Sequence, residues 1–138
     1  IVEHAERQDL RSTIDHIREL HEAGRYAEGL RIAVPLKESL DAEGHPGNVL
    51  YISLLNEIAH LYNACEATEA LRVGETAVEL SMEFDNLDSL QDDDREVIAE
   101  SYRLVGMLLT TSAKSTPKGL VQAKSFARTA LRLAPEGG

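Results

Sequence analysis

The chain has 138 residues, the size of one ordinary domain, and 43% of them are hydrophobic, which is enough to form a core. Its formal net charge is −10 and no basic stripe is visible, so we expect neither nucleic acid nor an anionic membrane as a partner. Only 4% of the residues are aromatic and tryptophan is absent, a composition that suits packed helices better than a β-sandwich.

Apolar residues recur at helical spacing in six segments separated by turn-forming residues. Gly24 ends the first segment, and Pro35 lies inside the second and predicts a local kink. The expected helices cover residues 2–23, 26–42, 49–64, 68–83, 93–111 and 120–133. Short connections between them predict an all-α fold of three antiparallel helix pairs. The pairs divide a single domain into about residues 1–47, 48–91 and 92–138.

The third segment has the clearest pattern, because Leu55, Ile58, Ala59 and Tyr62 fall at i, i+3, i+4 and i+7. We expect this face to point inward. A shift of 41 residues aligns the first segment with it, and a similar spacing recurs in the fifth segment at Tyr102, Val105, Gly106 and Leu109. The chain therefore reads as an internal repeat.

These patterns resemble the tetratricopeptide repeat, particularly the kinesin-light-chain type. The resemblance also rests on Gly44-His45-Pro46 as a connection, and on Ala123, Ala130 and Pro135 at the repeat's spacing in the last pair. Arg18 departs from the pattern, because it stands where the repeat has a small residue. The resemblance implies a short right-handed superhelix, in which the first helices of the pairs line a concave peptide-binding face.

By this resemblance, outward positions of the first helices form the partner-binding face. They are Asp15, Glu19, Glu22, Asn56, His60, Asn63, Arg103 and Met107. Asn56 is central, since an amide can donate to and accept from a peptide backbone, and we expect Arg103 and Glu19 to fix the orientation of the partner. The alternative for Asn56 is a solvated helix residue. Acids at Asp15 and Glu19 stand where a chaperone-tail clamp has a lysine and an asparagine, so they favour a basic partner.

We predict no catalytic site, no cofactor and no metal. His16 and His21 are five residues apart, about 140° around a helix, so they do not converge on a metal. The acidic run from Asp85 to Asp94 lacks the central glycine and closing glutamate of a calcium loop. A single cysteine, Cys65, excludes an internal disulfide and favours a reducing, cytoplasmic compartment. Because the chain begins with isoleucine, we expect it to be a piece of a longer protein.

The sequence therefore predicts a scaffold for protein–protein interaction, whose concave groove takes a peptide or amphipathic helix that carries basic residues. One alternative is a ligand- or peptide-sensing domain of a larger regulatory protein, which an apolar, enclosed groove around Met107 would favour. Another is an oligomerisation module that self-associates through the uncovered terminal helix with Phe126 and Leu133.

Overall fold

The computed structural model describes residues 2–44, 49–65, 68–84, 87–111 and 116–134. Within these ranges it contains six α-helices, one short 3-10 helix and no strand. The α-helices are α1 (Val2–Glu22), α2 (Tyr26–Ala42), α3 (Val49–Ala64), α4 (Glu69–Ser81), α5 (Asp92–Thr111) and α6 (Pro117–Leu133), and the 3-10 helix η1 covers Leu87–Ser89. The predicted all-α fold with six helices is confirmed. None of the helices in this part of the chain is long and apolar enough to cross a membrane.

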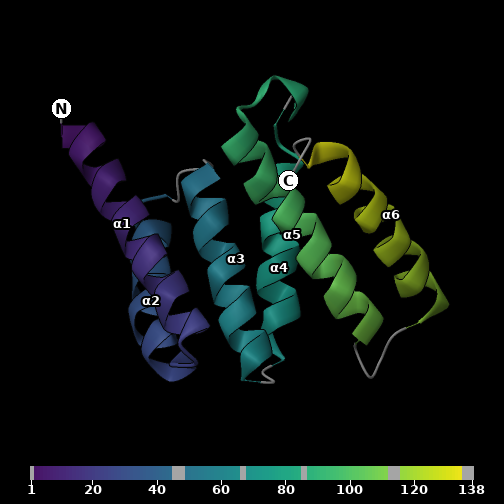
Figure 1. Cartoon of the computed structure of the whole chain (residues 1–138), viewed down its shortest axis with the longest axis horizontal. Coiled ribbons are helices and arrows are strands. Elements are labelled where there is room, and N and C mark those ends of the chain that lie inside the picture. Colours follow the sequence, from purple (N-terminus) through teal and green to yellow (C-terminus); the bar gives the residue numbers. More distant parts are fainter. Residues whose placement is uncertain (1, 45–48, 66–67, 85–86, 112–115, 135–138) are drawn as a thin grey trace.

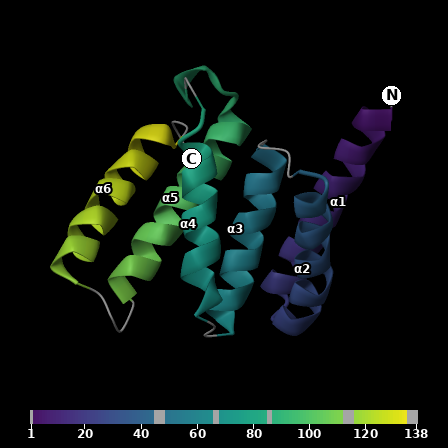
Figure 2. The same ribbon diagram turned by 180° about the vertical axis from the view of Figure 1, so that it is seen from behind.

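The helices stand side by side, with α1 and α6 at opposite ends of the row (Figure 1). Each α-helix packs on the next one in the chain, and α1 also packs on α3, as α3 does on α5. Figure 2 shows the opposite side, where α2 lies in front of α1 and α4 stands between α3 and α5. The first helices of the three pairs are therefore neighbours along one side of the molecule.

Local sequence signals explain where α1 ends and where α6 begins. Gly24 has a φ of +79°, and the next amide, of Arg25, donates to the carbonyl of Leu20 at 2.8 Å, which closes the end of α1 as predicted. The helix α6 begins three residues before the predicted start, because the Thr116 hydroxyl accepts a hydrogen bond from the Gly119 amide and a proline follows it.

Parts of the predicted pattern lie outside the described residues. They include His45 and Pro46 in the expected connection between the first two pairs, and Pro135 after the last helix. The helix α2 runs through Pro35 without a break, with the proline on its exposed side.

The core follows α3, which is buried without interruption from Tyr51 to Ala59. One side of α3 packs with α1 and α2, and the other packs with α4 and α5, so neighbouring core clusters share this helix. Leu55, Ile58 and Ala59 are no more than 1% exposed, which confirms that they point inward, while Tyr62 is half-buried. Fully burying one such aliphatic side chain contributes about 1.5–3 kcal/mol, so the buried side chains of α3 stabilise the packing on both of its sides.

Candidate functional site

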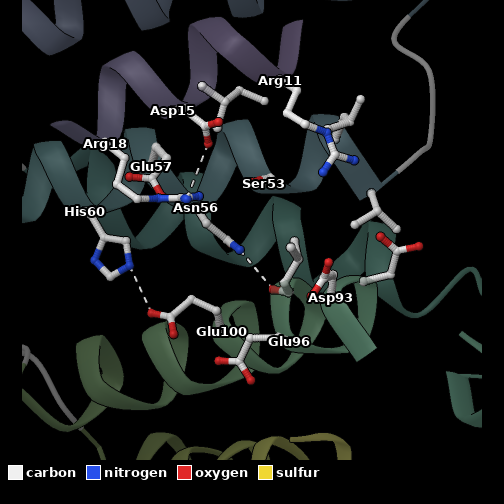
Figure 3. Close-up of a pocket in the computed structure, with 15 residues that line it drawn as sticks. Arg11, Asp15, Arg18, Ser53, Asn56, Glu57, His60, Asp93, Glu96 and Glu100 are labelled. Carbon is white, nitrogen blue, oxygen red and sulfur yellow. Dashed lines mark hydrogen bonds and ion pairs between the residues drawn. The ribbon is translucent and has the colours of Figure 1, made fainter. Parts of the chain in front are cut away.

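A groove with a volume of about 470 Å³ runs across α1, α3 and α5, the first helices of the three pairs. Figure 3 shows α1 on one side of it, α5 on the other and α3 between them. Its charged and polar lining residues are Arg11, Asp15, Arg18, Ser53, Asn56, Glu57, His60, Asp93, Asp94, Glu96 and Glu100. Three of the eight predicted partner-binding residues belong to this set: Asp15, Asn56 and His60.

Asn56 lies at the base of the groove, but its amide is already engaged. Its Nδ2 donates to the carbonyl of Val97 at 3.0 Å, and its Oδ1 accepts from the Ser101 hydroxyl at 2.7 Å. The residue is 3% exposed. The expectation that Asn56 points outward with a free amide is therefore wrong, because α5 packs against that flank of α3 and takes both hydrogen-bonding groups.

His60 joins the floor of the groove to α5. Its Nε2 lies 3.0 Å from a carboxylate oxygen of Glu100, as Figure 3 shows. Its ring stacks on that of His21 in α1, with 5.7 Å between the centroids, and the His21 ring in turn lies 5.7 Å from that of Tyr26. These contacts run through four helices, so His60 holds neighbouring pairs together besides lining the groove.

Glu100 is the acid lining the groove whose carboxyl pKa is shifted from its ordinary value. Burial raises the pKa of this carboxyl, but the hydrogen bond with His60 and the charges of His60 and Arg103 lower it more, and the pKa lies below its ordinary value of 4.5. Glu100 is consequently ionised near neutral pH and adds a negative charge to the α5 side.

The α1 side of the groove carries an arginine that the prediction did not include. The Arg18 Nε donates to a carboxylate oxygen of Glu57 at 3.2 Å, and its Nη1 lies 3.6 Å from Asp15. Glu57 has a side chain only 9% exposed, so this pair links α1 to α3 at the floor. The sequence held one signal for it, the arginine where the repeat pattern has a small residue.

The α5 side is a row of carboxylates: Asp93, Asp94, Glu96 and Glu100. Glu96 and Glu100 both pair with Arg103 on their own helix. In the described part of the chain Asp93 and Asp94 form no ion pair, which leaves two carboxylates to receive a cation. Six acids and two arginines line the groove, so its charge balance is negative.

No protein-family model, curated protein or solved structure matches this chain. The acids lining the groove do not converge on one point: no group of three or more His, Cys, Asp or Glu side chains among the described residues could hold a metal ion.

The other five predicted residues lie outside this groove. Glu19, Glu22 and Asn63 are exposed on α1 and α3. Arg103 and Met107 line a different groove, between α5 and α6. The structure therefore brings three of the eight predicted residues into the groove across α1, α3 and α5 and two into the groove between α5 and α6. Helical periodicity fixes the angle of a residue around its helix but not which neighbouring helix meets that angle.

Proposed function

We propose that the chain is a scaffold for protein–protein interaction, and that the groove across α1, α3 and α5 binds a basic peptide or amphipathic helix of a partner. The observation that supports this proposal is a groove across the first helices of the three pairs with a negative lining, in which Asp93 and Asp94 have no ion-pair partner among the described residues. Charges of this kind steer a basic segment and fix its register more than they add affinity.

The serial packing of the helix pairs supports the tetratricopeptide-like part of the proposal. In such an array each pair contacts its neighbours, and the first helices line one continuous surface. Here α1, α3 and α5 adjoin one another, and the groove is confined to these three helices. An extended or helical segment laid across them would meet all three pairs at once, which suits a scaffold better than a site for one small molecule.

The test uses two amphipathic peptides of about 18 residues, long enough to be helical, that share one leucine face. One carries lysines on its remaining surface and the other carries glutamates. Each is titrated into the isotope-labelled chain at about 0.15 M salt, and amide shifts are followed by NMR. We expect the lysine peptide to shift amides of α1, α3 and the start of α5, and the glutamate peptide to leave those of α1 and α3 unchanged.

The double variant Asp93→Asn/Asp94→Asn should weaken binding of the lysine peptide about fivefold, because two exposed charge pairs each contribute under 1 kcal/mol. The matched control, Glu75→Gln/Glu79→Gln, makes the same change in net charge on exposed positions of α4, outside the groove. Equal weakening by both variants would mean that net charge alone attracts the peptide. Either that result or no shift in the three helices would refute the proposed function.

A further inference from the structure

The last helix differs in charge from the rest of the chain. Between Pro117 and Leu133 it carries four basic residues and no acidic one, Lys118, Lys124, Arg128 and Arg132. The whole chain has 24 acidic and 14 basic residues, so the remainder holds 24 acids and 10 bases. One end of an acidic protein is therefore basic.

The same end exposes most of the large apolar side chains at the surface. Five such residues are exposed in the described part of the chain, and four of them lie on α5 and α6: Met107, Leu120, Val121 and Leu131. Leu131 is 79% exposed. Burying a leucine contributes about 1.5–3 kcal/mol, so a cluster of exposed apolar side chains is a candidate docking surface.

Three of these side chains border a groove of about 780 Å³ between α5 and α6. Small residues form the middle of it: Gly106, Ala123, Ala127 and Ala130. A Cβ atom on Gly106 would lie 3.3 Å from the carbonyl oxygen of Ala123, so glycine is what allows the two helices to approach closely. The result is a shallow apolar channel with Met107, Leu120 and Leu131 at its borders, the shape that accepts one face of a helix.

Two charged side chains line this channel, Arg103 and Lys124, and both are basic. Arg103 is paired with Glu96 and Glu100 on its own helix. Lys124 is exposed and has no ion-pair partner among the described residues. The channel thus combines an apolar floor with an uncompensated positive charge.

The packing of α5 on the preceding helix pair indicates what kind of element fits the channel between α5 and α6. Asn56 and His60 of α3 make the hydrogen bonds to α5, which lies against both α3 and α4. Arg103 and Met107 lie 47 residues after Asn56 and His60. By the repeat spacing of the sequence they occupy the corresponding positions on α5. The channel between α5 and α6 is thus the counterpart of the surface that α5 covers on the preceding pair.

We propose that this channel binds an amphipathic helix of a partner protein, with an apolar face flanked by aspartates or glutamates. A second copy is a poorer occupant. A two-fold pairing of α6 with itself would bring like charges together, and a head-to-tail pairing would offer α1, whose exposed described residues are all polar. The inference is independent of the function proposed above, because no residue lines both grooves.

The glutamate peptide described above is the probe, titrated into the full chain and followed by NMR and by calorimetry. We expect amide shifts on α6 and on the part of α5 that lines the channel, and no shifts on α6 with the lysine peptide. Lys124→Glu should weaken binding of the glutamate peptide about tenfold and create binding of the lysine peptide at the same helices. Arg128→Glu is the same change at an exposed position of α6 outside the channel, and it should weaken binding of the glutamate peptide less than twofold.

Equal binding of both peptides at this channel, or equal effects of Lys124→Glu and Arg128→Glu, would overturn the proposal. So would a dimer in sedimentation equilibrium that Leu131→Glu abolishes, since the channel would then belong to a second copy. Failure here leaves the shifts of the lysine peptide on α1, α3 and α5 unaffected, so the two hypotheses fail separately.

Discussion

Replacing Asn56 by alanine tests whether this residue is a binding group or a link between helices. The substitution removes two hydrogen bonds, of 3.0 Å to the Val97 carbonyl and 2.7 Å from the Ser101 hydroxyl. Each such bond contributes about 0.5–1.5 kcal/mol net, and Ser101 is fully buried, so its hydroxyl keeps only a weaker contact of 3.3 Å with the Val97 carbonyl. We expect Asn56→Ala to lower the free energy of unfolding by about 2 kcal/mol.

Urea denaturation of the whole chain measures this change. Asn63→Ala is the matched control, because it removes an exposed asparagine from the same helix and should change stability by less than about 0.5 kcal/mol. A double-mutant cycle with Ser101→Ala isolates the bond between the two side chains, and its coupling energy should be about 1 kcal/mol. The cycle is informative since each single variant removes the same Oγ–Oδ1 contact.

A loss for Asn56→Ala as small as that of Asn63→Ala, or strict additivity with Ser101→Ala, would refute the reasoning. The amide of Asn56 would then face solvent, and its role as a direct contact for a peptide backbone would again be the better interpretation.

Two further predictions concern pH and burial. Because the pKa of Glu100 is lower in the folded chain than its ordinary 4.5, the carboxylate stabilises the fold above about pH 5 and loses this effect as pH falls. Thermal melts of Glu100→Gln should therefore show lower stability at pH 7 and a shallower decline towards about pH 3; an unchanged decline contradicts the assignment. The second compares two leucines of α6: Leu133→Ala, at a fully buried site, should cost about 2–5 kcal/mol in urea denaturation, and Leu131→Ala, at an exposed one, less than about 0.5. Similar losses at both would mean that another part of the chain covers Leu131.

The helices themselves were predictable because their signals are local. Apolar spacing and turn residues located six helices, with ends within three residues of those observed. The largest difference, at the start of α6, had a readable cause in the Thr116-Pro117 pair, which caps a helix and begins it. Inward positions such as Ile58 were equally accessible, since periodicity assigns each residue an angle around its own helix.

The site was less predictable, because it depends on which helices become neighbours. The sequence predicts Asn56 and Met107 on one binding face, yet α5 covers the first, which is 3% exposed, and the second is 42% exposed. The ion pair between Arg18 and Glu57 joins residues that are 39 positions apart in the sequence, a separation that no local sequence pattern spans.

The sequence by itself determined an all-helical chain, the angle of each residue around its helix and an acidic overall charge. Only the tertiary structure decided which flank of each helix is covered. The physical reason is that α3 lies between two other first helices, α1 and α5, whereas α5 has α3 on one side and only α6 on the other. Equivalent positions such as His60 and Met107 therefore meet another helix in one place and solvent in the other.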